Sequence, residues 1–353
     1  MDFTLNEAER ELADLTRKIL NGRLTPERMR AVEAGDGFDR ALWADLAGAG
    51  ILSAALPEAL DGAGLGLLAQ CCVLTELGRA VAPVPYLGAA MATAALLAAG
   101  DEDLLPAVAA GERTAVLVLP FATPPGAPPR GVDVDGAALS GTVPGVADVL
   151  AADVLLVPAG DGLWAVDAGA ARLAPLTSLD LTRTLADVTL DGAPGQRVGD
   201  LAPALDAARA TGATLLASEQ LGVAQWCLDT TVEYVRTRHQ FGRPVGSFQA
   251  LKHRLAELWV AITQARAVAR YAAGCLADDD PDLPVAVALA QAHCGPVAVR
   301  AAEECVQLHG GIGFTWEYPA HLYLKRAKAD AIALGTAERH RAALAGLVGL
   351  PPA

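Results

Sequence analysis

The segment RHQFGRPVGSFQ, residues Arg238–Gln249, joins two long stretches of helical character and sets the plan of the C-terminal half of the chain. Apolar residues recur with a helical period from Leu215 to Arg238 before this segment and from Phe248 to Ala273 after it, which predicts a long helix on each side. Two more helical stretches follow, Leu283–Leu308 and Tyr323–Leu344. We therefore expect a C-terminal bundle of four helices.

Towards the N-terminus the chain changes character twice. Helical patterns such as Phe38–Leu52 fill the first stretch. Near Gly111 the composition shifts to short apolar and β-branched runs, including Thr114–Leu119 and Leu163–Val166, with Asp-Gly pairs that are typical of turns between strands. From about Leu201 the helical period returns. This order predicts an α+β fold in three domains: an N-terminal helical domain at 1–111, a middle β domain at 112–200 and a C-terminal helical bundle at 201–353.

Length and charge exclude several classes of function. The 353 residues are too many for one simple core. The 27 basic and 41 acidic residues give a net charge of −14, which argues against binding nucleic acid through the bulk field. No apolar run is flanked like a membrane span, and the first residues contain no apolar signal core. We expect a cytoplasmic protein that does not contact a membrane.

Metal sites and phosphate-binding loops are not indicated either. The six cysteines are scattered without a CxxC pair, which favours reduced, buried thiols. The run Gly62–Gly66 lacks GxGxxG spacing and follows a helix and a loop, so we interpret it as a plain turn. His309 has no second ligand at helical spacing, and no metal is expected.

Two further segments complete a pattern with Arg238–Gln249. They are Gln307–Phe314 (QLHGGIGF), followed by Glu317–Pro319 (EYP), and Gly335–Arg339 (GTAER). In order and separation the three resemble the RxxFGxxxxxxQ, QxxGGxGY…EYP and GTxEIxR motifs of the acyl-CoA dehydrogenase family. The early Leu56–Glu58 also resembles that family's PExxGG loop. One such motif would be weak, whereas three in order indicate an acyl-CoA dehydrogenase-like chain.

The resemblance implies FAD as cofactor, α,β-dehydrogenation of an acyl-CoA thioester, and an electron-transferring flavoprotein as electron acceptor. It also implies an oligomer, because the flavin of one subunit would be served by residues of its neighbour. The residues implied to bind the cofactor are Arg238, Gln240, Phe241, Phe248 and Gln249 on the flavin, Gln307, Gly310 and Gly311 at the adenosine end, and Thr336 and Glu338 near the pyrophosphate and ribose. An arginine suits this role because it forms charge-assisted hydrogen bonds with a pyrophosphate, and glycines let the backbone come close.

The catalytic base that this chemistry needs is missing from its usual place. Removal of a proton beside a thioester requires a carboxylate, which most family members carry just before the GT of the last motif. Leu334 stands there in this chain, and the alternative position that some members use falls at Gly212. Glu219 follows seven residues later, about 10 Å further along the same helix face. It is the candidate for a displaced base.

The middle region departs from the family as well. The segments that correspond to the flavin-facing loop and strand are Leu119–Pro124 and Thr142–Asp148, and they lack most of the serine, threonine and tryptophan contacts to the isoalloxazine. Ala152–Val157, in contrast, resembles the family's ADxxLV strand. We expect the fold of this region to persist while its flavin-ring contacts are lost.

These losses are similar to those of the short, base-lacking subunit of actinobacterial heteromeric acyl-CoA dehydrogenases, several of which act in steroid side-chain breakdown. The leading hypothesis is an FAD-binding subunit whose partner, a second acyl-CoA dehydrogenase-like chain, supplies the glutamate. One alternative is a self-sufficient homo-oligomeric flavoenzyme that uses Glu219. The other is a non-catalytic binding subunit on the same fold.

Overall fold

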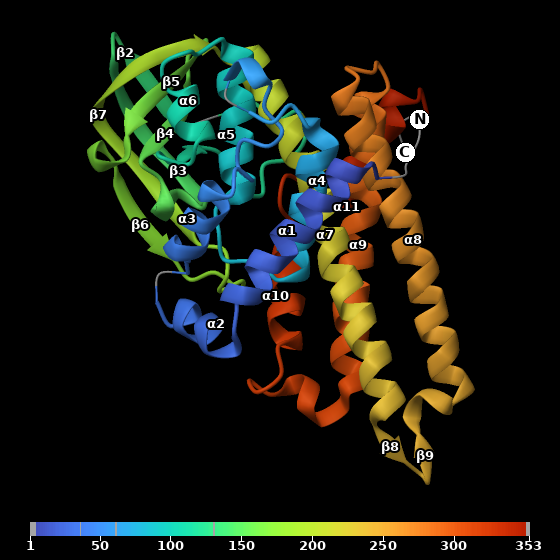
Figure 1. Cartoon of the computed structure of the whole chain (residues 1–353). Coiled ribbons are helices and arrows are strands. Elements are labelled where there is room, and N and C mark those ends of the chain that lie inside the picture. Colours follow the sequence, from blue (N-terminus) through green and yellow to red (C-terminus); the bar gives the residue numbers. More distant parts are fainter. Residues whose placement is uncertain (1–4, 36, 61, 130, 351–353) are drawn as a thin grey trace.

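A computed structural model describes residues 5–35, 37–60, 62–129 and 131–350. Within these residues the chain runs through helices, strands and helices in the predicted order, so the predicted α+β fold is confirmed (Figure 1). A short 3-10 helix, η1, occupies Glu58–Leu60. The α-helices of the first region are α1 (Glu7–Arg23), α2 (Pro26–Glu33), α3 (Arg40–Gly48), α4 (Gly66–Arg79), α5 (Tyr86–Ala99) and α6 (Leu105–Ala109).

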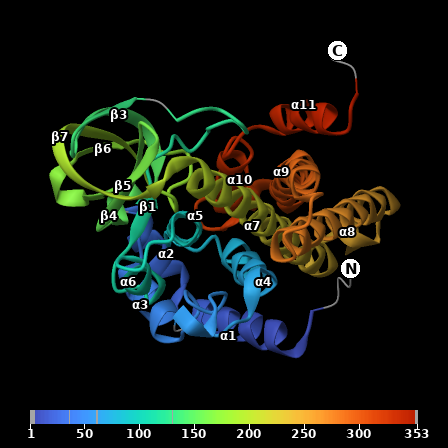
Figure 2. The same cartoon turned by 90° about the horizontal axis from the view of Figure 1, so that it is seen from above.

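The middle region is a seven-stranded sheet in the order β1-β4-β5-β7-β3-β2, with β6 paired to β7. Figure 2 shows these strands curving around a common interior. Their buried side chains form a separate core that is rich in valine and leucine. The pair β1–β4 is parallel and the other pairs are antiparallel. The strands are β1 (Ala115–Leu117), β2 (Val132–Asp135), β3 (Ala138–Ala147), β4 (Val154–Ala159), β5 (Gly162–Asp167), β6 (Arg172–Leu176) and β7 (Leu185–Asp200).

Of two predicted Asp-Gly turns, one is confirmed and one is wrong. Gly136 turns the chain between β2 and β3 with a φ of 60°. Gly192, with a φ of 62°, lies inside β7 instead of ending a strand. Strand β7 stays paired with β3 as far as Pro194 and pairs with β5 from Gly195 onward. A positive φ at glycine allows a local bend without breaking the strand. The Asp191-Gly192 pair therefore predicts a turn where the strand continues.

The C-terminal region contains three long helices and two short ones. The predicted single helix Tyr323–Leu344 is wrong, because the chain breaks between α10 and α11. Leu334 and Gly335 have φ values of 52° and 103°, and left-handed backbone ends a right-handed helix. The helices are α7 (Leu201–Thr237), α8 (Gln249–Ala277), α9 (Leu283–His309), α10 (Ala320–Asp330) and α11 (Ala337–Leu347).

Helix α7 joins the two helical cores. Its first half packs with the N-terminal helices, and its second half packs with α8 and α9. Two glycines let α4 cross α7 very closely. A Cβ on Gly78 would lie 2.2 Å from the Glu219 carbonyl oxygen, and one on Gly222 would lie 2.0 Å from the Thr75 carbonyl oxygen. Any side chain at these positions would push the helices apart, so the middle of α7 is held rigidly.

The apolar character of the C-terminal half belongs to the protein core. One helical stretch among the described residues, Leu283–Phe314, is long and apolar enough to cross a membrane, but 61% of its apolar window is buried inside the molecule. All six cysteines are buried free thiols, as predicted.

Candidate functional site

The first motif forms an exposed hairpin at the far end of α7. Strands β8 (His239–Gln240) and β9 (Arg243–Pro244) extend beyond α7 and α8, and the 3-10 helix η4 (Val245–Ser247) leads into α8 (Figure 1). Phe241 and Gly242 make the turn with φ values of 55° and 76°, the pattern of a two-residue hairpin. The Phe241 side chain is 88% exposed. The tip of the hairpin therefore displays a large apolar ring to solvent.

The hairpin is braced by its own aromatic and cationic groups. The rings of Phe241 and Phe248 meet edge to face with centroids 6.1 Å apart. The Arg243 guanidinium lies 4.0 Å from the centroid of the Phe248 ring. Arg238, Gln240 and Gln249 are exposed beside them. Five predicted cofactor residues therefore lie together on one exposed surface.

The second motif lies at the same end of the bundle. Helix α9 ends at His309, and Gly310 continues with a φ of 62° into the 3-10 helix η5 (Gly310–Phe314). The His309 ring stacks between Tyr234 of α7 and Tyr318, with centroid distances of 4.3 and 4.4 Å. This stack fixes η5 beside the end of α7.

Open backbone characterises this second motif. Gly310 and Gly311 are exposed, and a Cβ on either would meet nothing within 4 Å among the described residues. Gln307 is exposed on the last turn of α9. The structure therefore brings the residues of the first two motifs to one end of the bundle.

The third motif lies elsewhere. Thr336 caps the N-terminus of α11, and Glu338 follows in its first turn. Arg341 of α11 donates to the Ala292 carbonyl oxygen, which lies 17 residues before the end of α9. At 1.5 Å per residue this is about 25 Å from His309. Thr336 and Glu338 are thus not part of the hairpin-end surface of the same chain.

Leu334 closes the space where the family carries its base. Its side chain is 8% exposed, and its N–H donates to the Phe121 carbonyl oxygen at 2.8 Å. The cavity beside it has a volume of only about 30 Å³, with Met91, Phe121 and Asp148 among its walls. A Cβ on Gly212 would lie 2.7 Å from the Met91 sulfur, so Met91 fills the second possible base position. Ligand pockets usually measure about 300–1,000 Å³, and this one cannot admit a thioester.

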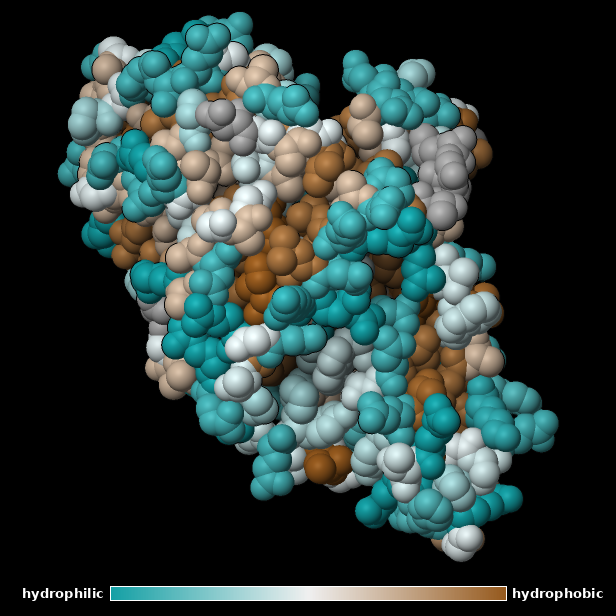
Figure 3. Space-filling view, in the orientation of Figure 1, coloured by the Kyte–Doolittle hydropathy of each residue, from teal (hydrophilic) through white to brown (hydrophobic). Residues whose placement is uncertain are grey.

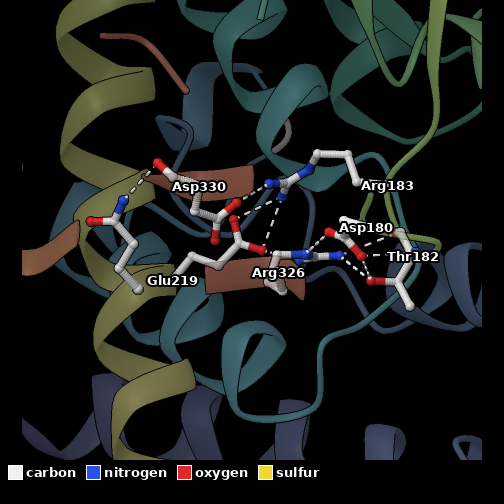
Figure 4. A network of polar contacts seen from close by, with 7 residues as sticks. Asp180, Thr182, Arg183, Glu219, Arg326 and Asp330 are labelled. Atoms are coloured by element: carbon white, nitrogen blue, oxygen red, sulfur yellow. Dashed lines mark hydrogen bonds and ion pairs between the residues drawn. The ribbon is translucent and has the colours of Figure 1, made fainter. Parts of the chain in front are cut away.

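Behind this closed cavity lies a buried ion network that the sequence analysis missed (Figure 4). Arg183, from the loop between β6 and β7, donates to both carboxylate oxygens of Glu219 at 2.9 and 2.8 Å and to Asp330 at 2.6 Å. Arg326 of α10 donates to Glu219 as well, and to Asp180 of the same loop. The network ties the β region to α7 and α10.

The network engages Glu219 completely. Burial would raise the pKa of Glu219, but Arg183 and Arg326 outweigh it and hold the pKa below its ordinary value. A general base must be free to take a proton and to reach its substrate. Glu219 would have to leave two buried arginines, which argues against its use as a displaced base. A sequence signal existed, since Glu219 and Arg326 are charges within otherwise apolar helix faces.

A second carboxylate beside the cavity has the opposite character. Burial raises the pKa of Asp148 to about 6, although Arg183 opposes the rise. Asp148 is 6% exposed, and its backbone is left-handed with a φ of 60°.

The described residues contain no group of three or more histidine, cysteine, aspartate or glutamate side chains that could hold a metal ion.

Comparisons with known proteins agree across the chain. The family described as acyl-CoA dehydrogenase, N-terminal domain, matches residues 6–112, and the acyl-CoA dehydrogenase, C-terminal domain, matches residues 205–348. Acyl-CoA dehydrogenase IpdE2 of Mycobacterium tuberculosis is 37% identical over 93% of each chain. Acyl-CoA dehydrogenase FadE34 of the same organism is 40% identical over 82% of this chain, which spans only 39% of that longer relative.

Two solved structures match almost the whole chain. A chain of the ChsE4-ChsE5 complex from Mycobacterium tuberculosis is 34% identical, with a TM-score of 0.91 and full coverage of both chains. A chain of a variant of the Tcur3481-Tcur3483 steroid ACAD is 36% identical, with a TM-score of 0.88 and coverage of 98% of this chain and 99% of that one. Both structures pair two differently named chains.

Proposed function

This chain belongs to the acyl-CoA dehydrogenase family, whose members are oxidoreductases that act on CH–CH bonds, and we propose that it is the FAD-binding subunit of a heteromeric enzyme. In this proposal a second family member supplies the catalytic glutamate and the acyl-CoA cavity. The observation that carries it is the closed space at Leu334, where both the carboxylate and the room for a thioester are missing. The likeness to chains of two-component complexes supports the same assignment.

The exposed end of the bundle fits a phosphate-bearing cofactor. Arg238 is exposed at the C-terminus of α7, where it can donate to a pyrophosphate oxygen. The open backbone at Gly310 and Gly311 leaves room for close approach. The hairpin projects away from the β region of its own chain (Figure 1). These residues therefore suit a cofactor that a neighbouring chain shares, which makes the partner part of the site.

When bound, FAD supplies the hydride acceptor of the family's reaction. The role of this chain is then to hold the cofactor through Arg238, Gln240 and Phe241 and to leave proton transfer to the partner. Thr336 and Glu338 begin α11, which contacts α9 at Ala292, about 25 Å from the hairpin end of the bundle. We assign them to the pyrophosphate and ribose of a second cofactor position, held by this chain's own α11.

The test is the visible spectrum and native mass of the purified chain, alone and after co-expression with a second acyl-CoA dehydrogenase-like chain. We expect flavin absorbance only in the mixed complex, with a native mass that includes both chains. A yellow homo-oligomer whose flavin bleaches with an acyl-CoA would refute the proposal. A complex that takes up neither FAD nor acyl-CoA would favour a non-catalytic subunit.

A further inference from the structure

A separate cavity of about 560 Å³ lies between α1, α4, α7 and α8. Each helix presents one face to it, because the lining positions recur every three or four residues, as in Arg10, Ala13 and Arg17 of α1. Figure 3, in the orientation of Figure 1, shows recessed hydrophobic surface between hydrophilic residues on the face of the molecule where α1 lies. The cavity is distinct from the exposed hairpin and from the closed space at Leu334, and the proposed function does not use it.

Five arginines line this cavity in a chain of net charge −14. The lining contains only two carboxylates, Asp14 and Glu76. The arginines are Arg10, Arg17, Arg79, Arg266 and Arg270. Since the chain as a whole is acidic, the cavity is a local region of concentrated positive charge.

The two carboxylates are already engaged. Arg17 donates to both oxygens of Glu76 at 2.8 Å each and to Asp14 at 2.8 Å. Arg79 pairs with Asp229 at 3.0 Å, outside the lining. Arg17 therefore satisfies most of the hydrogen-bonding capacity of both acids, and Arg79 also lies 4.0 Å from Glu76. Within the described part of the chain neither acid pairs with Arg10 or Arg266.

Arg266 is the arginine of this cavity whose surroundings best suit an anionic ligand. It is half-buried on α8, and its Nη2 donates to the amide oxygen of Gln225 at 2.6 Å. Among the described residues no carboxylate lies within ion-pair distance of it. Burial lowers the pKa of Arg266, the charges of Arg270 and Arg79 lower it further, and the carboxylate of Asp229 only partly opposes them. A half-buried guanidinium beside like charges is costly, and a bound anion would relieve that cost.

The floor of the cavity is apolar or neutral. Cys71 and Cys72 of α4, Leu221 of α7 and Ala269 of α8 form it, and Ser218 adds a hydroxyl. A volume of this size suits a small organic molecule better than a bare ion. Arginines can bind a phosphate group through charge-assisted hydrogen bonds, while the apolar floor can contact the organic part of the same ligand.

We propose that the cavity between α1, α4, α7 and α8 binds a small organic phosphate, with Arg266 and Arg10 on the phosphate groups and the apolar floor on the organic part. Arg10, exposed on α1, makes no ion pair with any described residue and can turn towards the ligand. Gln225, which donates to Asp229 at 2.8 Å, holds Arg266 in place. The site is independent of the cofactor surface at the hairpin.

The experiment is calorimetric titration of the full chain with ADP, inorganic pyrophosphate and adenosine. We expect saturable binding of ADP, weaker binding of pyrophosphate, and none of adenosine. Arg266→Gln should weaken ADP binding at least about tenfold, since a hydrogen bond to a charged group is lost. Arg10→Gln, an exposed change that cannot disturb the core, should weaken it in the same direction.

Two controls give the result its meaning. Arg254→Gln removes the same charge from the same helix, where Arg254 pairs with Glu304, and should change the affinity less than about twofold because distant exposed charges are screened. Arg238→Gln tests whether ADP binds the cofactor surface instead. The proposal is overturned if no ADP binds, if pyrophosphate binds as tightly as ADP, or if Arg238→Gln abolishes binding while Arg266→Gln and Arg10→Gln do not.

Discussion

The hairpin end of the bundle and the surroundings of Leu334 carry motifs of the same family, yet they differ in how open they are. At the hairpin, Phe241 is 88% exposed and the backbone at Gly310 is uncovered. At Leu334 the side chain is buried beside a cavity of about 30 Å³. The chain has kept a surface that another molecule can reach and has filled the space where a substrate would react. The proposed division of labour between two chains would account for both features.

The largest effect is expected on turnover. The chain alone should show no acyl-CoA dehydrogenation, because neither Leu334 nor Gly212 can accept a proton, and loss of a general base typically costs about 10²–10⁴ in rate. Rates of flavin bleaching by an acyl-CoA would be compared for the chain, its partner and the complex. Full activity of the lone chain would show that the space at Leu334 is not closed to substrate.

The next largest effect concerns the buried network behind Leu334. Glu219→Gln leaves Arg183 and Arg326 without their shared carboxylate, and breaking a buried pair costs about 3–5 kcal/mol. Chemical denaturation measures the change in the free energy of unfolding. Glu233→Gln, an exposed change on the same helix, is the control and should stay within about 0.5 kcal/mol. If the two changes lowered the free energy of unfolding equally, the network would not be a major source of stability.

A smaller effect is expected at the open end. Arg238→Gln should weaken FAD retention by the complex about ten- to a hundredfold, because a hydrogen bond to a charged group contributes about 1.5–3 kcal/mol. Arg236→Gln, exposed two residues earlier on α7, is the matched control. Fluorescence titration of the apo-complex with FAD provides the readout. Unchanged affinity in Arg238→Gln would place the cofactor elsewhere.

The closed region should also show its own pH dependence. Burial raises the pKa of Asp148 to about 6 from an ordinary value of 3.8, so folding favours the protonated form. The stability that this group contributes is present at low pH and is lost as pH rises from about 4 through about 6. Asp148→Asn should therefore be more stable than the native chain by about 3 kcal/mol near neutral pH, with a smaller difference near pH 4. A difference that does not vary with pH would contradict this.

The smallest expected effect is none at all. Leu334→Glu restores the family's residue but not the space around it, so no dehydrogenation should appear in the chain alone. Leu334→Gln controls for the cost of placing a polar group in a site that is 8% exposed. Activity in Leu334→Glu, with a folded protein by circular dichroism, would show that the cavity opens in solution.

Local signals in the sequence predicted the order of helices and strands well and failed where the backbone becomes left-handed. The pattern in Leu283–Leu308 gave a helix that the structure extends by only one residue. The break at Leu334 and Gly335 was not visible, because the apolar pattern continues across it. Gly192 gave the opposite error, since a turn signal inside β7 serves as a bend.

Candidate residues were easier to name than to place. The motif spacing pointed to the hairpin and to Gly310, but only the stack of Tyr234, His309 and Tyr318 shows that they share one end of the bundle. Thr336 belongs to the same resemblance, but it begins α11, which contacts α9 at Ala292, about 25 Å from His309. The sequence marks Glu219 as a candidate base, whereas the structure pairs it with two arginines that lie 36 and 107 residues away along the chain.

The sequence by itself determined the family, the helix–strand–helix order and the absence of a carboxylate at Leu334 and Gly212, because these follow from residue identity and local period. Only the tertiary structure decided that Met91 and Phe121 close the space at Leu334, that Arg183 and Arg326 engage Glu219, and that four helices gather five arginines around one cavity. The reason is physical: pKa, burial and cavity volume depend on which distant segments pack together, and no local pattern records that.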